Sequence, residues 1–80
     1  MKVQILGTGC AKCRTLAANA ETAIQELGLD AEIEKVEQIA DIARMGAMMT
    51  PALAIDGQLR STGLIPVAQI KEILEVDVGK

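Results

Sequence analysis

The stretch Lys2-Val-Gln-Ile-Leu-Gly-Thr-Gly-Cys-Ala-Lys-Cys13 decides the fold of this chain. Polar and apolar residues alternate over 2–6, which predicts a short strand with one buried face. The strand breaks at Gly7-Thr-Gly9, and a helical pattern follows. Cys10 and Cys13 therefore lie at the start of a helix, where free N–H groups and the positive end of the helix dipole stabilise a thiolate. This placement predicts redox chemistry.

The helical pattern that begins at the cysteines is long, and Gly28 is suited to end it in a left-handed conformation. Residues 31–36 alternate again, which predicts a second strand. A helix between two strands favours a right-handed crossover and parallel pairing. The apolar positions expected to face the core are Cys13, Leu16, Ala17, Ala20, Ala23, Ile24 and Leu27.

The second half of the sequence has a different pattern. A short helix ends at Gly46, and its apolar residues are Ile39, Ile42, Ala43 and Met45. Residues 52–55 form a continuous apolar run typical of a buried strand, and Asp56-Gly57 is a strong two-residue hairpin signal. The polar residues 58–62 suit a return strand at the sheet edge.

Pro66 is suited to the first position of a last helix, because its missing N–H would have no helical partner there. Residues 76–80 are expected to fray. The predicted order is β-α-β-α-β-β-α in one domain spanning 1–80, with no repeat or linker. The core positions of the last helix are Val67, Ile70, Ile73 and Leu74.

Composition limits the function classes. The chain has 80 residues, of which half are hydrophobic, and no Phe, Tyr or Trp. Its net charge of −3 and lack of a basic stripe argue against nucleic acid and against anionic membrane surfaces as partners. The N-terminal apolar run is too short for a signal peptide and no stretch reaches membrane-spanning length, so a cytoplasmic location is expected.

The element order, with Cys-x-x-Cys at the first helix and Thr50-Pro51 before the third strand, resembles the thioredoxin fold in its minimal, glutaredoxin-sized form. The stretches Gly7–Cys13 and Met49–Leu53 resemble small archaeal and bacterial thioredoxin-like proteins called redox-active disulfide proteins. The resemblance covers nearly the whole chain. It implies an α/β fold with a mixed four-stranded sheet and helices on both faces.

The resemblance also implies a role for each site residue. Cys10 would be the attacking thiolate of a thiol–disulfide oxidoreductase, and Cys13 the resolving thiol. Pro51 would follow a cis peptide bond beside the cysteines, and the backbone of Thr50 would pair with the substrate. Gly9 and Lys12 are supporting residues. The charge of Lys12 could lower the pKa of Cys10, although its flexible stem favours a solvated position.

The chain departs from better-known family members at several positions. Gln4 occupies the position of a buried Asp that assists proton transfer in thioredoxins, and an amide cannot act as a base. Gly9 replaces a Trp. A glutathione site is not expected, because the matching positions hold Thr8, Met49-Thr50 and a lone Gly63.

The implied partners are protein disulfides and a thioredoxin-reductase-like flavoprotein, acting on a monomer without cofactor or bound metal. Two alternatives use the same cysteine pair. The motif Gly-x-Gly-Cys-x-x-Cys also resembles the cysteine pair of copper chaperones, in which two thiolates bind Cu(I), and Met45, Met48 and Met49 could add thioether ligands. The pair could also serve a non-catalytic redox sensor. A purely structural disulfide is disfavoured, because the loop is small and the cytosol is reducing.

Overall fold

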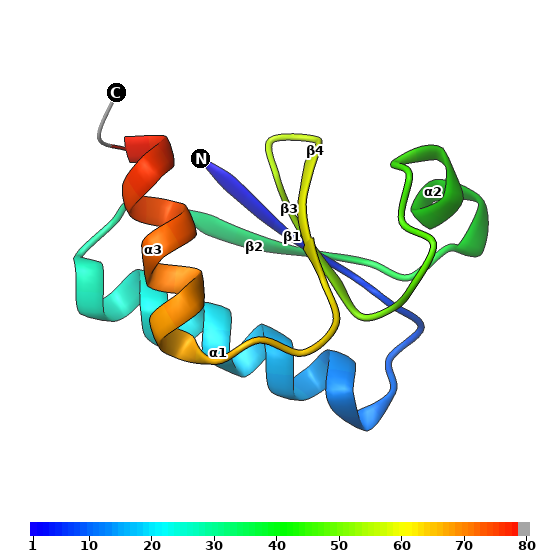
Figure 1. Cartoon of the computed structure of the whole chain (residues 1–80), viewed down its shortest axis with the longest axis horizontal. Coiled ribbons are helices and arrows are strands. Elements are labelled where there is room, and N and C mark those ends of the chain that lie inside the picture. Colours follow the sequence, from blue (N-terminus) through cyan, green and yellow to red (C-terminus); the bar gives the residue numbers. More distant parts are fainter. Residues whose placement is uncertain (79–80) are drawn as a thin grey trace.

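The computed structural model describes residues 1–78, and its seven elements follow the predicted order (Figure 1). The stretches predicted to be strands form strands, and those with helical spacing of apolar residues form helices. The predicted α/β class is therefore confirmed. The elements are β1 (Lys2–Leu6), α1 (Ala11–Leu27), β2 (Glu32–Val36), α2 (Ile39–Arg44), β3 (Ala52–Ile55), β4 (Gln58–Thr62) and α3 (Val67–Val78).

The four strands form one mixed sheet in the order β2-β1-β3-β4. β1 lies at the centre, parallel to β2 and antiparallel to β3, and β4 is the antiparallel hairpin partner of β3. The pairing of β3 with β4 shifts register between Leu53 and Ala54, so Arg60 has no partner opposite it. The sequence pattern did not predict this bulge.

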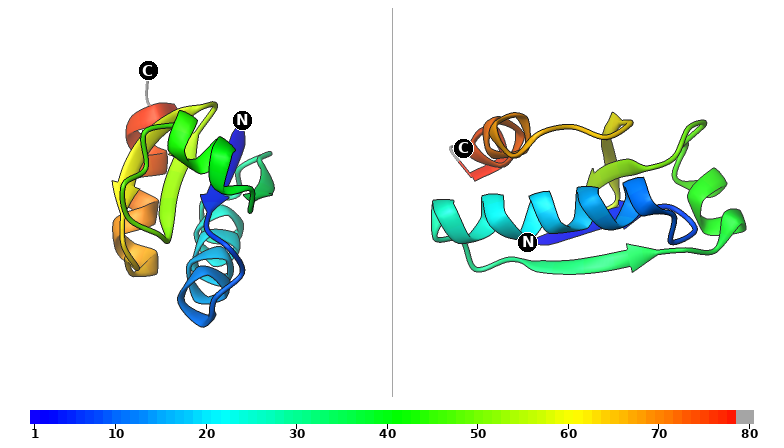
Figure 2. Two further views of the ribbon diagram at one scale, coloured as in Figure 1. Left: turned by 90° about the vertical axis from the view of Figure 1, so that its right-hand side faces the viewer. Right: turned by 90° about the horizontal axis from the view of Figure 1, so that it is seen from below.

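The larger core lies between the sheet and the helix pair α1 and α3 (Figure 2). Ile5 pairs with Leu53 and Val3 with Ile55, so these four side chains share one face of the sheet. The predicted apolar stripe of α1 is buried against them, except for Leu27, which is only half-buried. With no aromatic ring in the chain, aliphatic side chains fill this layer alone. The fully covered ones include Leu16, Ile70 and Leu74.

The smaller core lies on the opposite face of the sheet, under α2. Leu6, Ala52 and Ala54 face Ile42 there. The apolar pattern of this helix is misleading, because Ile42 alone is buried whereas Ile39 is 73% exposed. The helix is short, and of its other predicted apolar residues Met45 packs partly buried against this cluster, whereas Ala43 is exposed like Ile39.

Glycines end α1 and form the hairpin turn as predicted, whereas Pro66 is not in the first helical position: α3 begins at Val67, and the Pro66 carbonyl accepts hydrogen bonds from Gln69 N and Ile70 N, as that of an N-cap residue does. Gly28 caps α1 in the left-handed conformation (φ +66°), and its N–H and that of Leu29 bond carbonyls of the last turn. Asp56 and Gly57 both have positive φ, as a type I′ hairpin requires. α3 continues through Val76 to Val78, where fraying was expected; the rest of that expected tail, 79–80, lies outside the described residues.

Two ion pairs connect α3 to other elements. Lys71 on α3 contacts Glu26 on α1 at 2.9 Å, and Arg60 of the β4 bulge pairs with Asp77. Asn19 of α1 donates a hydrogen bond to the carbonyl of Ile65, which holds the segment that leads into α3. Within residues 1–78, no helix combines the length and the apolar character needed to cross a bilayer.

Candidate active site

Cys10 is the N-cap of α1. Its backbone is extended (φ −69°, ψ 169°), and its carbonyl accepts the first helical hydrogen bond, from Arg14 N at 3.0 Å. The side chain takes the usual position of a capping group, because Cys10 Sγ accepts a hydrogen bond from Cys13 N at 3.4 Å. The side chain is exposed. Cys10 therefore lies with an exposed sulfur at the positive end of a helix, which is the position that the sequence predicts.

Cys13 lies one turn further along and points into the protein. The residue is only 5% exposed, and its Sγ lies 2.7 Å from Cys10 Sγ, within hydrogen-bonding contact. Both side chains are free thiols. The helix thus presents one sulfur outward and holds the second directly behind it, which is the arrangement needed to close an intramolecular disulfide.

The pKa values of the two thiols are shifted in opposite directions. The pKa of Cys10 is lowered, first by the hydrogen bond from the Cys13 side chain and then by that from the Cys13 backbone N–H. The pKa of Cys13 is raised, first by burial and then by its hydrogen bond to Cys10. The backbone N–H of Lys12 also lowers the pKa of Cys10. Of the two thiols, Cys10 therefore ionises more readily, and the Cys13 thiol donates a hydrogen bond to it.

These shifts predict the pH dependence of alkylation. A lowered pKa means that Cys10 remains a thiolate at pH values where an ordinary cysteine is protonated, so iodoacetamide should modify Cys10 first and remain effective at lower pH. In Cys13→Ala the largest cause of the shift is absent, so the alkylation midpoint of Cys10 should move to higher pH. Peptide mass mapping across a pH series measures both midpoints. Equal midpoints in the two proteins would contradict this account.

Gly7 is a site residue that sequence reasoning did not single out. A Cβ at this position would overlap Cys13 Sγ and would lie 3.2 Å from Cys13 Cβ. Gly7 has no positive φ, so its role is close approach rather than an unusual backbone conformation. Its backbone N–H continues the β1–β2 ladder by bonding Val36 O at 2.9 Å. The only feature of the sequence that could have indicated this role is that Gly7 lies between the first strand and the cysteine pair.

Thr50 and Pro51 lie beside this glycine. The Thr50–Pro51 peptide bond is cis, which is the isomer that the family resemblance implies. Pro51 is buried, and its Cα would lie 3.9 Å from a Cβ at Gly7. Its carbonyl accepts a hydrogen bond from Gly63 N at 2.6 Å. Thr50 is exposed.

Gln4 faces away from the cysteines. Its neighbour Ile5 lines the pocket at Cys13, and successive side chains on a strand point to opposite faces. On its own face Gln4 donates to Glu34 at 2.8 Å and accepts from Gly57 N at 2.8 Å. The hydrogen bond from Gln4, followed by the charge of Lys2, lowers the pKa of Glu34. Gln4 therefore joins the β1–β2 pair to the β3–β4 hairpin and has no contact with the redox site.

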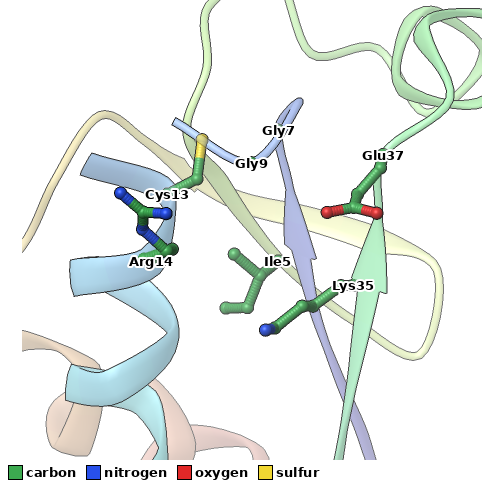
Figure 3. A pocket seen from close by; sticks show the side chains of 7 residues that line it. All are labelled: Ile5, Gly7, Gly9, Cys13, Arg14, Lys35 and Glu37. Atoms are coloured by element: carbon green, nitrogen blue, oxygen red, sulfur yellow. The ribbon is translucent and has the colours of Figure 1, made fainter. Parts of the chain in front are cut away.

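A small pocket of about 30 Å³ opens beside Cys13 (Figure 3). Gly7, Gly9 and Ile5 form its floor, and charged side chains from α1 and from the end of β2 surround it. Position 9 favours glycine, because its φ of +87° is one that other residues rarely adopt. Within residues 1–78, no group of three or more potential metal-ligating side chains is gathered. The charged residues at the pocket are Arg14, Lys35 and Glu37.

Comparison with known proteins agrees with this geometry. The sequence matches the Thioredoxin domain family over residues 1–75. It is 47% identical over 75 residues to a thioredoxin of Methanothermobacter thermautotrophicus, a match that covers 92% of this chain and 97% of the relative. It is 43% identical over 74 residues to a thioredoxin of Methanocaldococcus jannaschii, covering 91% and 85%. The chain therefore belongs to the thioredoxin domain family of thiol–disulfide oxidoreductases.

Proposed function

We propose that this chain is an electron carrier that exchanges a Cys10–Cys13 dithiol or disulfide with the disulfides of other proteins. One observation carries the proposal. An exposed thiol with a lowered pKa caps a helix, and a buried thiol with a raised pKa lies 2.7 Å behind it. This asymmetry separates an attacking group from a resolving group.

The exchange proceeds in two steps. Cys10 thiolate attacks one sulfur of the target disulfide, which forms a mixed disulfide and releases the first target sulfur as a thiolate. Cys13 then loses its proton and attacks Cys10 Sγ, so the bond to the target breaks and the second target thiolate leaves. The target gains two electrons, and this chain ends with a Cys10–Cys13 disulfide.

The segment before Pro51 suits contact with an extended protein substrate. Thr50 is exposed beside buried Pro51, and we expect its backbone to pair with a substrate chain. Met49 precedes it and is 64% exposed, and Met48 is almost fully exposed. Flexible methionine side chains adapt to different apolar partners, so we assign them to substrate contact rather than to a metal.

The cycle needs a reductant that restores both thiols. We assign this role to a thioredoxin-reductase-like flavoprotein in the cytoplasm, acting on a monomeric carrier. Glutathione is a poorer donor, because the expected glutathione-binding positions hold Thr8, Met49-Thr50 and a lone Gly63.

A coupled assay tests the proposal. The chain is mixed with a disulfide-containing protein and an archaeal thioredoxin reductase with its reduced cofactor, and cofactor oxidation is followed. We expect catalytic turnover that depends on this chain and is not replaced by glutathione with glutathione reductase. Efficient turnover with glutathione would contradict the assigned reductant. Failure of both systems, together with retention of both thiols under mild oxidant, would favour a non-catalytic role.

A further inference from the structure

The second step of the proposed exchange needs a proton acceptor, and this inference rests on that step. Cys13 is buried and must become a thiolate before it attacks Cys10. Gln4 cannot accept the proton, because it is an amide and faces the other side of the sheet. Gly7, which lies against the sulfur, and Pro51, which lies beside Gly7, have no ionisable group.

The pocket beside Cys13 contains a group that can accept a proton. It is lined by Cys13 itself and by one carboxylate, that of Glu37, which follows β2. A Cβ at Gly9 would lie 3.5 Å from Glu37 Oε2, so this carboxylate lies against the turn that precedes the cysteines. Figure 3 shows the carboxylate directed from the β2 side toward the pocket, with Cys13 on the far side.

Two glycines line the pocket together with Cys13 and Glu37. The missing side chain at Gly7 leaves room for Cys13 Sγ itself, and Gly9 places no side chain before Glu37. The pocket volume of about 30 Å³ exceeds the roughly 10–15 Å³ that one water molecule needs. Glu37, Lys35 and Arg14 provide polar partners for such a water, and none of them forms an ion pair within residues 1–78.

We propose that Glu37 accepts, through water in this pocket, the proton that Cys13 loses as it attacks the mixed disulfide. The Cys13 proton passes to water and a water proton to Glu37. Cys13 thiolate bonds to Cys10 Sγ, and the bond from Cys10 to the target breaks with the electron pair on the leaving sulfur. Glu37 then returns its proton to solvent. Arg14 and Lys35 are the cations that face the transient thiolate, and Cys10 is the remaining titratable group at this sulfur.

The reaction of the reduced protein with the aromatic disulfide 5,5′-dithiobis(2-nitrobenzoate) isolates this step. Cys10 attack releases one coloured thiolate, and Cys13 attack releases the second. The leaving thiolate needs no proton, so the second phase reports the ionisation and attack of Cys13 alone. Stopped-flow traces across a pH series give both rates.

Glu37→Gln is the test variant, and Glu32→Gln on the exposed β2 edge is the control with the same charge change. We expect the second phase of Glu37→Gln to slow by roughly 100-fold near neutral pH, with the deficit closing as pH rises toward the pKa of Cys13. The first phase should be unchanged. Glu37→Asp should recover part of the rate.

Electrostatics alone predicts the opposite sign. Removing a negative charge near Cys13 would favour its thiolate and accelerate the second phase. A second phase in Glu37→Gln that equals or exceeds that of Glu32→Gln at all pH values would therefore overturn the inference while leaving the proposed function intact. A parent protein that stops after the first phase would overturn both, because no intramolecular disulfide would then form.

Discussion

Cys13→Ser should accumulate stable mixed disulfides with target proteins, whereas Cys10→Ser should accumulate none. In the proposed exchange Cys10, whose sulfur is exposed and whose pKa is lowered, attacks first, and Cys13, whose sulfur is buried, resolves the intermediate. Without Cys13 the intermediate persists, and without Cys10 it never forms. Both variants should lose reductase-coupled turnover by roughly 1,000-fold or more, since loss of an attacking nucleophile can cost an enzyme about 10⁶ in rate.

Non-reducing electrophoresis followed by mass spectrometry of the trapped species measures this difference. Ala11→Ser is a matched control, because it introduces the same hydroxyl group on the exposed turn between the two cysteines. This variant should turn over normally and trap nothing. Trapping by Cys10→Ser in place of Cys13→Ser would reverse the assigned roles.

Most of the fold could be predicted because its determinants are local. Alternation over 2–6, the helical stripe that begins at Cys13 and the Asp56-Gly57 turn each specify one element, and their order leaves few ways to assemble a sheet. The prediction of core residues was wrong in α2, which is short. Ile39 has the same apolar character as Ile42, and only the approach of α2 to the sheet determines which of them is buried.

The site was only partly predictable for a similar reason. Cys10 and Cys13 are three positions apart in the sequence and share a helix turn, so their spacing already indicates chemistry. Glu37 is 24 residues from Cys13 along the chain and belongs to a segment without a motif. Its position depends on parallel pairing of β1 with β2, which places the end of β2 next to the Gly7–Gly9 turn. Tertiary contacts of this kind leave no local pattern.

The bulge in β4 also depends on tertiary structure. Residues 58–62 read as a regular polar edge strand, but Leu59 pairs with Ala54 and Ser61 with Leu53, so Arg60 is the extra residue. The irregularity directs Arg60 to Asp77 on α3. An edge strand that bends in this way is also a poorer template for pairing with a second sheet.

Gly7→Ala should destabilise the reduced protein by about 1–3 kcal/mol, the usual cost of overpacking a core. The added methyl would occupy the position of Cys13 Sγ, and both neighbouring walls, the β1–β2 ladder and Pro51, are backbone that yields little. For a domain of this size the melting temperature should fall by about 4–8 °C per kcal/mol. Displacement of Cys13 from Cys10 should also slow formation of the intramolecular disulfide.

A double-mutant cycle separates this clash from a general effect of losing a glycine. Cys13→Ala removes the sulfur and retains the Cβ, so adding Gly7→Ala to that background should cost much less, with the remaining 3.2 Å approach to the Cβ leaving a small penalty. Gly46→Ala provides the contrasting case, because space is open there and only its φ of +88° opposes a side chain. Its cost should be the same with and without Cys13. Chemical denaturation, under reducing conditions, of the four proteins that make up the Gly7–Cys13 cycle yields the coupling energy. Equal costs of Gly7→Ala in the two backgrounds would show that the glycine is needed for a reason other than the sulfur.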